Sequence, residues 1–390
     1  MEKIKKRKEE RLKKKKQKRR IFILLLLIIL TFFSCYWITK LYLKSKNEIP
    51  VTAKTESHNE EANVEKETSD NGETSKIDDA EKEPQKEPEK ISITISAAGD
   101  CTLGSDINYI SGQSFMNEYK KQQDYGYFFE NVKEVFDNDD LTIVNLETTF
   151  TEATARANKK FRFKGNPEFT NIIKEGSIEA VNIANNHSHD YLQQGYDDTI
   201  KNLKNAGIDY FGYENKSIKD VNGVMVGMIG YEGWSYTQNL KDKIFNSINE
   251  LKDNGAQLVI ISFHWGVERK NYPNEAQKNL ARYSIDAGAD LVIGHHPHVI
   301  QGIEEYKGKN ILYSLGNFCF GGNKNPSDKD TFIFQQTFNF EDGKLLVDNE
   351  NKIIPCSISS VKNRNDYKPT ISTGDEKNRI LDRIKKYSNF

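Results

Sequence analysis

Residues 91–104 read ISITISAAGDCTLG, and this stretch decides the class of the fold. Ile91, Ile93 and Ile95 alternate with polar residues, which is typical of a strand with one buried face. The strand then runs through two alanines into a turn at Gly99 and Asp100. The stretch therefore predicts a strand that carries a carboxylate at its carboxyl end.

Apolar runs further along the chain predict more strands, with helical patterns between many of them. The predicted strands cover residues 141–146, 178–184, 224–230, 258–263, 291–293 and 311–315. The predicted helices cover residues 192–206, 240–252 and 274–287. Residues 332–340 and 345–348 predict an antiparallel hairpin around residues 341–343. This alternation indicates an α/β domain with parallel or mixed sheets over residues 91–360.

The chain begins with a basic block over residues 1–20, followed by the apolar run IFILLLLIILTFFSCYWI at residues 21–38. A spanning helix needs roughly 20 apolar residues, so residues 21–43 predict one transmembrane helix. The basic excess before it predicts a single-pass protein of the cell membrane with a cytoplasmic N-terminus and an extracytoplasmic C-terminal domain. A cleaved signal peptide and a lipoprotein signal at Cys35 are the alternatives. Bulky residues such as Phe33 and Trp37 near the candidate cleavage site favour the uncleaved anchor.

Residues 44–90 are rich in Glu, Lys, Ser, Thr, Asn and Pro, and predict a disordered spacer that holds the next domain away from the membrane. Residues 361–390 predict a C-terminal extension with a helical pattern over 379–386, and whether it packs on the core stays open. The chain carries 56 basic and 57 acidic residues. Because basic and acidic residues are concentrated in different regions, the near-zero net charge says nothing about partners.

The four cysteines are too few and too irregularly spaced for a disulfide scaffold or a zinc module. Cys35 falls in the predicted membrane segment, which leaves Cys101, Cys319 and Cys356. One bridge, between Cys101 and Cys319, and free buried thiols are the two alternatives.

Polar residues follow the carboxyl ends of the predicted strands. They are Asp100; Asn145 and Glu147; Asn185, Asn186, His187 and Asp190; His264, Trp265 and Glu268; His295, His296 and His298; and Ser314 and Asn317. Ligands of open α/β sheets bind at this edge, and five of the seven histidines of the chain fall in these motifs. Alone, Asp100 could cap a turn and His264 could be a core histidine, but together the motifs predict one site.

Imidazole, carboxylate and amide groups suit Zn, Mn or Fe ions. Such an ion would polarise a substrate oxygen and activate water, and a histidine outside the ligand set could act as a general acid. Arg162 and Lys164, which alternate with Phe161 and Phe163, suggest an anionic ligand. For Arg269 and its neighbour Lys270, an ordinary solvated surface is an equally good interpretation.

Seven motifs in this order, GDCTLG, VNLETTF, FRFKGNP, ANNHSHDY, FHWGVE, GHHPHVIQG and SLGNFCF, span about residues 93–322. The set resembles the CapA family of bacterial poly-γ-glutamate capsule synthesis proteins. That family resembles the calcineurin-like metallophosphoesterases, which implies a sandwich of two mixed β-sheets flanked by helices. The predicted anchor also fits, because CapA-type proteins sit on the outer face of the membrane beside the polymer synthase.

The resemblance implies roles for individual residues. The expected metal ligands are Asp100, Glu147 as a bridging carboxylate, Asn186, His264, His296 and His298. The expected catalytic residues are His187 as general acid, Asp190 and Glu268. The expected substrate contacts are Arg162, Lys164, Asn145, Trp265 and Asn317. His295 is an additional histidine whose role stays open, and Thr102 stands where the phosphoesterases carry a histidine.

Three functions are compatible with these expectations. The first is a factor in the synthesis, release or export of an anionic capsule polymer such as poly-γ-glutamate, acting as a hydrolase with one or two divalent metal ions. The second is a metallophosphoesterase for a phosphate ester of the cell envelope, and the third is a non-catalytic polymer-binding subunit. The expected partners are membrane-embedded synthase or export subunits and the anionic polymer, with no nucleic acid.

Overall fold

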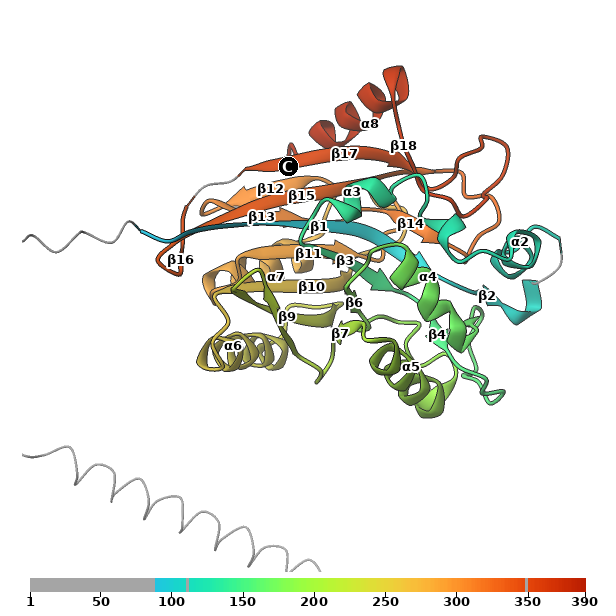
Figure 1. Cartoon of the computed structure of the whole chain (residues 1–390), viewed down its shortest axis with the longest axis horizontal. Coiled ribbons are helices and arrows are strands. Elements are labelled where there is room, and N and C mark those ends of the chain that lie inside the picture. The colour runs from blue at the N-terminus through green and yellow to red at the C-terminus, as the bar shows by residue number, and fades with distance from the viewer. Residues whose placement is uncertain (1–87, 110–111, 348–349) are drawn as a thin grey trace, which may run out of the picture. The chain divides into compact units, whose positions relative to one another are not determined.

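Two mixed β-sheets lie face to face in the computed structural model, which describes residues 88–109, 112–347 and 350–390 (Figure 1). The first sheet contains, in order, β18 (Thr370–Ile371), β17 (Asn351–Ser357), β15 (Asp330–Glu341), β1 (Lys90–Thr102), β3 (Leu141–Leu146), β6 (Ala180–Asn182) and β7 (Asp209–Phe211), with β14 (Asn317–Phe320) beside β1 and β16 (Lys344–Leu345) beside β15. The strand β1 pairs antiparallel with β15 and parallel with β3, so this sheet is mixed.

The second sheet is also mixed. It contains, in order, β12 (Ile303–Tyr306), β13 (Lys309–Leu312), β11 (Leu291–His295), β10 (Leu258–Trp265), β9 (Val224–Gly233) and β8 (Ser217–Val221). Its central strands are parallel, and both outer pairs are antiparallel. A small third sheet contains β2 (Ser105–Asp106), β5 (Phe163–Gly165) and β4 (Thr149–Phe150).

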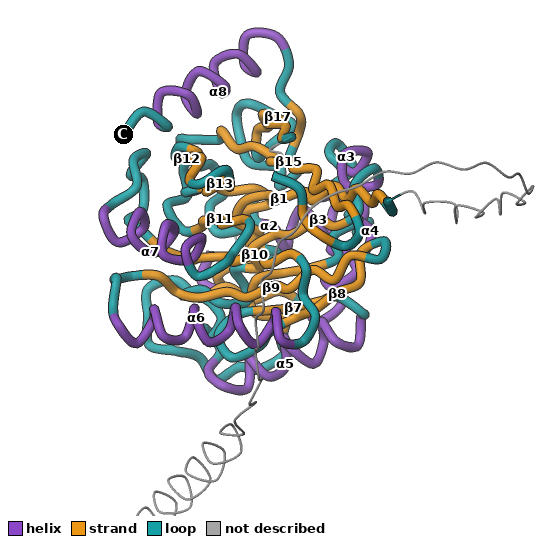
Figure 2. Tube along the Cα trace, turned by 90° about the vertical axis from the view of Figure 1, so that its left-hand side faces the viewer, coloured by secondary structure: helices purple, strands orange, loops and turns teal. Residues whose placement is uncertain are grey.

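Most helices of the described residues cover the outer faces of the two large sheets, and the last one lies against β17 and β12 (Figure 2). They are α2 (Phe115–Gln122), α3 (Lys133–Asp137), α4 (Thr170–Glu175), α5 (Leu192–Ala206), α6 (Gln238–Asp253), α7 (Glu275–Asp286) and α8 (Gly374–Tyr387), with the short 3₁₀ helices η1 (Ile107–Tyr109), η2 (Gly126–Phe128) and η3 (Pro167–Phe169). Helices α2 to α5 pack on the first sheet, and α6 and α7 pack on the second.

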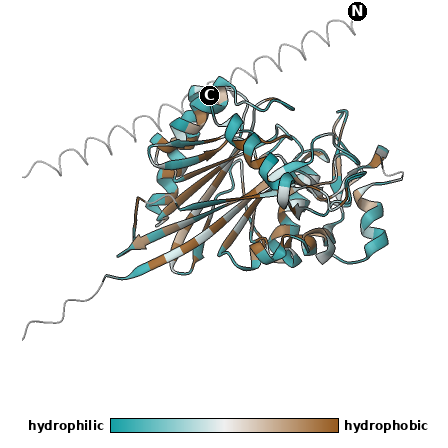
Figure 3. Cartoon of the chain, turned by 90° about the horizontal axis from the view of Figure 1, so that it is seen from above, coloured by the Kyte–Doolittle hydropathy of each residue, from teal (hydrophilic) through white to brown (hydrophobic). Residues whose placement is uncertain are grey.

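Alternation along each strand creates three separate core layers. On β3, Leu141 and Ile143 face the other sheet, whereas Val144 and Leu146 face the helices. Successive side chains of a strand point to opposite faces, so a strand buried on both sides must be apolar throughout. Figure 3 shows hydrophobic residues running along these central strands. The continuous apolar runs of the sequence therefore correspond to strands between two packed layers.

The predicted α/β class with mixed sheets is confirmed. Helix α5 has the bounds predicted from the sequence, and the predicted hairpin is formed by β15 and β16. The strand predicted over 178–184 is shorter, because only residues 180–182 pair in the sheet and the chain then turns toward the site. Among the described residues no helix is long and apolar enough to cross a membrane. The predicted transmembrane helix at 21–43 and most of the predicted spacer lie outside these residues.

The C-terminal extension packs on the domain. Helix α8 contacts β17 and β12, and its buried residues Ile380 and Ile384 belong to the core layer between the two sheets. The three cysteines of the described chain, Cys101, Cys319 and Cys356, are buried free thiols. Of the two alternatives for the cysteines, the structure therefore contains the free thiols.

Candidate metal centre

The carboxyl ends of strands from both large sheets meet at one place. In the first sheet, Asp100 on β1 lies opposite Asn145 on β3, and in the second, His264 on β10 lies opposite His295 on β11. A direct hydrogen bond joins the sheets here, because the main-chain N–H of His296 donates to Oδ2 of Asp100 at 3.2 Å. Motifs far apart in the sequence therefore contribute to a single site, as predicted.

Two sets of potential metal ligands overlap at Glu147. One contains Glu147, His264 and His296, and the other contains Asp100, Glu147 and His298; within each set the ligand atoms lie within 4.8 Å of one another. Oε1 of Glu147 lies 3.5 Å from Nε2 of His264 and 3.8 Å from Nε2 of His298. A carboxylate shared by two ligand sets is the arrangement of a bridging ligand, which is the role expected for Glu147.

Polar atoms without partners indicate that the centre fits a cation. Both carboxylate oxygens of Glu147 are buried and accept no hydrogen bond, and Oδ1 of Asn186 is in the same state. Buried polar atoms of native proteins are almost always satisfied, so an unpaired buried carboxylate fits a cation as its partner. The oxygen and imidazole donors of these residues suit a divalent ion such as Zn, Mn or Fe.

The charges of the centre are strongly coupled. Burial would raise the pKa of Asp100, but the adjacent imidazoles of His295 and His298 hold it well below its ordinary value. Burial raises the pKa of Glu147 well above its usual range, against the opposing charge of His298. Burial lowers the pKa of His264 and brings that of His296 to about 4. A divalent cation among these groups would favour the ionised form of Glu147.

The charge of His298 follows from its two acidic neighbours. Burial opposes that charge, but Glu147 and Asp100 outweigh the effect and raise the pKa of His298 to about 10. Nδ1 of His298 donates a hydrogen bond to Oδ1 of Asn317 at 2.8 Å. This bond leaves Nε2 of His298 on the side of Glu147, which is the usual way in which an outer partner orients a ligand histidine. Asn317 therefore lines the cavity and orients the ring of His298.

The backbone that presents the histidines is strained. His296 has a φ of 96° and His298 a φ of 57°, both in the left-handed region that non-glycine residues rarely adopt. Pro297 lies between them, and Trp234 packs edge-on against the ring of His296 at 4.7 Å. Backbone strain of this kind concentrates at functional sites, where the surrounding structure enforces it.

Asn145 holds the first sheet's ligands in place instead of contacting substrate as predicted. It is fully buried, and its Nδ2 donates to Oδ1 of Asp100 at 2.8 Å. Its Oδ1 accepts a hydrogen bond from Nδ2 of Asn182 at 2.9 Å. A Cβ at Gly230 would lie 2.1 Å from Oδ1 of Asn182, so the glycine provides the space for this amide. Sequence reasoning missed Asn182, whose signal is a polar residue within an apolar strand.

His187 lies beside the ligand sets and pairs with Asp190. Its Nδ1 is 2.7 Å from Oδ2 of Asp190, and its Nε2 is 3.9 Å from Oε1 of Glu147. Asp190 is fully buried and also accepts hydrogen bonds from Nζ of Lys159 and the main-chain N–H of Phe163. Burial lowers the pKa of His187 although Asp190 opposes the shift. The pair fixes the imidazole with Nε2 toward the centre, which suits proton transfer.

A cavity of about 390 Å³ opens onto this centre. The predicted residues in its wall are His187, Glu268, His298 and Asn317, together with Arg269. Phe161 and Phe163 contribute an aromatic wall, and the ring of Phe163 lies 4.3 Å from that of His187. Glu268 is exposed at the cavity, so it can meet a ligand but does not join the buried ligand sets.

Three predicted substrate contacts lie elsewhere. The indole of Trp265 has no exposed surface, stacks on Phe263 and donates to the carbonyl of Tyr313, so it is a core residue. Nζ of Lys164 lies over the ring of Tyr191 and donates to the carbonyl of Ala153.

The predicted substrate contact Arg162 donates through Nη1 to the carbonyl of Ala157, away from the cavity wall. Successive side chains of this stretch point to opposite sides. Phe161 and Phe163 face the cavity, so Arg162 and Lys164 face away from it, contrary to the prediction.

His295, whose role the sequence leaves open, has a defined place in the structure. It is fully buried, and its Nδ1 lies 3.4 Å from Oδ1 of Asp100. Neither ring nitrogen has a hydrogen-bond partner. The additional histidine therefore stabilises the charged form of Asp100. The hydroxyl of Thr102 is also buried and unpaired, and it does not have this effect.

Comparison with known proteins gives a consistent result. The sequence profile of the family described as "Bacterial capsule synthesis protein PGA_cap" matches residues 94–322. The capsule biosynthesis protein CapA of Bacillus anthracis is 31% identical over 330 residues, which cover 78% of this chain and 75% of that protein. The PGA biosynthesis protein CapA of Bacillus subtilis (strain 168) is 33% identical over 250 residues, which cover 58% of this chain and 63% of that protein.

The matched region contains every residue of the two ligand sets, from Asp100 to His298, together with the His187–Asp190 pair. The resemblance predicted from the motifs is thus confirmed by an independent match over more than half of the chain. The chain belongs to the bacterial capsule synthesis protein family, PGA_cap.

Proposed function

We propose that this protein takes part in the synthesis, release or export of an anionic capsule polymer, poly-γ-glutamate, and hydrolyses that polymer with the help of a divalent metal ion. One observation carries the proposal: two ligand sets share the unpaired buried carboxylate of Glu147, directly beside an open cavity lined by His187. Membership of the capsule synthesis family supports the polymer as the substrate.

The residues that would hold the metal are Asp100, Glu147, His264, His296 and His298, with Asn186 as the further expected ligand. When bound, one or two ions of Zn, Mn or Fe would polarise a substrate oxygen and make a nearby water more acidic. The strained loop from His296 to His298 and the hydrogen bond from Asn317 keep these ligands in place.

Protein side chains supply the proton transfer. With its Nδ1–H directed to Asp190, His187 presents Nε2 to the cavity, where it accepts or delivers a proton. Asp190 keeps the ring oriented and stabilises it when charged. Phe161 and Phe163 form an aromatic wall on this side of the cavity.

A direct assay tests the proposal. Full-length protein purified in detergent is incubated with poly-γ-glutamate, and polymer length and bound metal are measured. We expect metal to be bound and the polymer to be shortened, with both effects abolished by a chelator. Metal-bound protein that leaves poly-γ-glutamate intact would overturn the hydrolase assignment.

A second function is supported by the bridging position of Glu147 and by the adjacent Asn186 and His187, which match the motifs of the metallophosphoesterases. Aryl phosphate diesters in the same assay distinguish it: cleavage of the diester without shortening of the polymer would assign the site to a phosphate ester of the cell envelope. Polymer binding by metal-free, inactive protein would assign it to a binding subunit.

The membrane part of the proposal rests on the sequence. The apolar run at residues 21–43 and the basic block before it support a single-pass anchor with the domain outside the cell. Protease added to intact protoplasts should degrade the domain, and resistance to protease would contradict this orientation. Membrane-embedded synthase or export subunits are the proposed partners, and they should co-purify with the full chain.

A further inference from the structure

Three cavities are arranged along one segment, residues 321–328. The cavity at the metal centre has a volume of about 390 Å³ and shares the wall residues Phe161, Gly322 and Asn323 with a neighbour of about 350 Å³. Its other neighbour measures about 720 Å³ and shares Pro326, Ser327 and Asp328 with it. The three cavities are therefore neighbours along one segment, and this row, with the metal centre in the middle, is called the groove here.

Building on the proposed function, we infer that this groove holds an extended stretch of linear polycarboxylate, so that the protein engages the polymer at an interior position instead of at a chain end. A pocket closed on one side would admit only an end, whereas this groove continues on both sides of the site. Each of the three cavities lies in the range of about 300–1,000 Å³ that is typical of ligand sites.

Basic side chains without a carboxylate partner lie along the groove. Lys160 and Lys324 line the smaller outer cavity, Arg269 lines the central one, and Lys362 lines the larger outer one. All four are exposed, and within the described part of the chain no carboxylate lies at ion-pair distance from any of them. Positive charges on both sides of the site suit a ligand that carries a carboxylate on every repeating unit.

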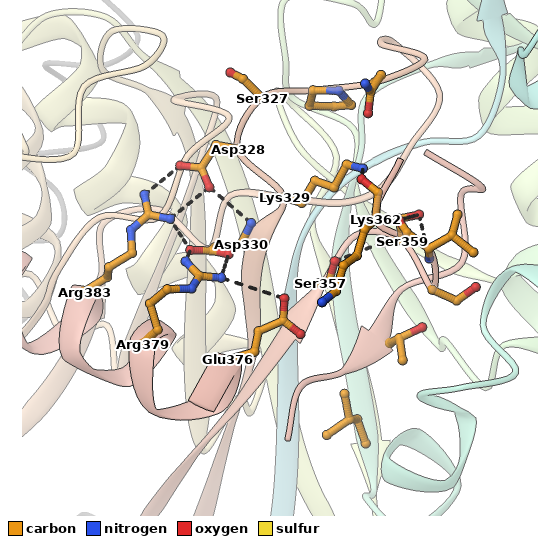
Figure 4. A pocket seen from close by; sticks show the side chains of 16 residues that line it. Ser327, Asp328, Lys329, Asp330, Ser357, Ser359, Lys362, Glu376, Arg379 and Arg383 are labelled. Carbon is orange, nitrogen blue, oxygen red and sulfur yellow. Dashed lines mark hydrogen bonds and ion pairs between the residues drawn. The ribbon is translucent and has the colours of Figure 1, made fainter. Parts of the chain in front are cut away.

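Other basic residues of the larger outer cavity build its wall. Figure 4 shows Arg379 and Arg383 reaching from α8 to Asp328 and Asp330. Nη2 of Arg379 donates to Oδ1 of Asp330, and both outer nitrogens of Arg383 donate to Asp328. These guanidinium groups are therefore bound to the segment beside the groove. Nζ of Lys329 donates to the carbonyls of Lys362 and Arg364, so Lys362 is the described cation of this wall that remains available to a ligand.

The segment is also fixed at its other end. Nδ2 of Asn365, which is fully buried, donates to the carbonyls of Phe320 and Asn323. The main-chain N–H of Asn365 donates to the carbonyl of Lys324. Ordered contacts on both sides give residues 321–328 a defined course, so the groove is preformed and does not depend on the ligand.

A binding experiment tests the groove without requiring catalysis. Full-length Lys324→Glu/Lys362→Glu protein is compared with wild type for affinity to fluorescein-labelled poly-γ-glutamate. Lys201→Glu/Lys344→Glu serves as the control, because it makes the same charge change at exposed lysines outside the groove. We expect the groove variant to bind about tenfold more weakly and the control to bind as wild type does. Equal affinity of the two double variants would overturn the proposal.

Polymer with bulky groups blocking both ends tests engagement at the interior. We expect the blocked polymer to bind as tightly as the free polymer, and loss of binding would contradict the interior mode. Both measurements are repeated with Glu147→Gln, which removes the shared ligand. Binding that depends on Lys324 and Lys362 in a protein that never shortens the polymer would retain the groove and reject only the hydrolysis.

Discussion

His187 and Asp190 form a buried pair in which Nδ1 of the imidazole lies 2.7 Å from Oδ2 of the carboxylate. The pair directs Nε2 of His187 toward Glu147, at 3.9 Å from its Oε1. The histidine is therefore held beside the metal ligands without belonging to either ligand set. That separation is what allows its role to be tested independently of metal binding.

His187→Ala should abolish proton transfer and leave the metal centre loaded. We expect activity on poly-γ-glutamate to fall by about 10²- to 10⁴-fold, the usual contribution of a general acid or base, with unchanged metal content and circular dichroism. His189→Ala is the matched control, because His189 is exposed and stacks on Tyr196. Full activity of His187→Ala, in the assay or by complementation in cells that make the polymer, would reject the catalytic role.

His296→Ala removes a ligand from one of the two sets and leaves the other complete. We expect the bound metal to decrease and polymer hydrolysis to be lost, while the domain stays folded by circular dichroism. Metal analysis of the purified protein gives the readout. Unchanged metal content and activity would show that His296 is not a ligand.

Glu147→Gln should reduce the stabilisation that metal binding gives to the domain without destabilising the metal-free domain. The buried carboxylate lacks hydrogen bonds, so a neutral amide should leave the metal-free protein at least as stable as wild type. Saturating metal should stabilise wild type by about 2.7 kcal/mol at 100 times the dissociation constant and the variant by much less. Thermal unfolding with metal and with chelator measures both, with the exposed Glu134→Gln as control. Equal metal stabilisation of all three proteins would contradict the shared-ligand assignment.

Asp139 should make the domain less stable as the pH rises toward 8. Burial raises the pKa of Asp139 to about 7. The folded state therefore binds this proton more tightly than the unfolded state. The stability that the proton contributes is complete below about pH 4 and is lost as the pH rises through 7. Asp139→Asn stays neutral and should be more stable than wild type at pH 8, because each tenfold difference in proton affinity between the two states corresponds to about 1.4 kcal/mol.

Urea unfolding at pH 4 and pH 8 measures the effect of Asp139→Asn. The difference from wild type should disappear at pH 4, where Asp139 is protonated. The exposed Asp253→Asn is the control for a change of surface charge. A gain of the same size at both pH values would show that burial of a charge is not the cause.

The three buried thiols should be unreactive in the folded protein. Burial raises the pKa of Cys101 to about 12, and it shifts those of Cys319 and Cys356 in the same direction. In a Cys35→Ser background, maleimide labelling followed by mass spectrometry should detect no modification until denaturant is added, and then three labels. Rapid labelling of the native protein would contradict this arrangement.

Arg383→Ala should destabilise the domain through the C-terminal helix. Oδ1 and Oδ2 of Asp328 accept hydrogen bonds from Arg383 at 2.9 Å and 2.6 Å, and Asp330, a second partner, is only 6% exposed. Removal of Arg383 leaves Asp328 without its ion-pair partner, whereas the more deeply buried Asp330 keeps Arg379. The free energy of unfolding should therefore fall by about 1 kcal/mol, and the melting temperature by about 2–4 °C. Lys385→Ala, an exposed change on the same helix, should have little effect. Equal melting temperatures would show that these ion pairs do not hold the helix.

The sequence predicts most of the metal centre because strand ends are readable from a single chain. Apolar runs define where Asp100, Glu147, His264 and the histidines after β11 emerge, and parallel strands bring those ends to one edge. The confirmed prediction is their convergence, since Asp100 and His296 are joined by a hydrogen bond across 196 residues of sequence. The shared use of Glu147 depends on how the two sheets face each other, which the strand pattern alone does not encode.

The predicted site residues that lie elsewhere in the structure were misassigned for a common physical reason. Residue type alone does not tell whether a side chain at a strand end faces the site or the core, so Trp265 was expected at the site but lies in the core. The predicted substrate contacts of Arg162 and Lys164 are wrong for a similar reason, because Phe161 and Phe163 are the residues of this stretch that face the cavity. The segment 321–328 has no hydrophobic pattern of a helix or a strand. Its place along the groove follows only from tertiary contacts.

The main-chain hydrogen bond from His296 to Asp100 also has a consequence for biosynthesis. The ribosome completes Asp100 and Glu147 early, whereas His264 is added with β10 of the second sheet and His296 and His298 only after β11. A nascent chain thus holds the carboxylates long before the imidazoles. On the proposed function, metal binding would be a late step in the maturation of the protein, and truncated translation products should carry no intact centre.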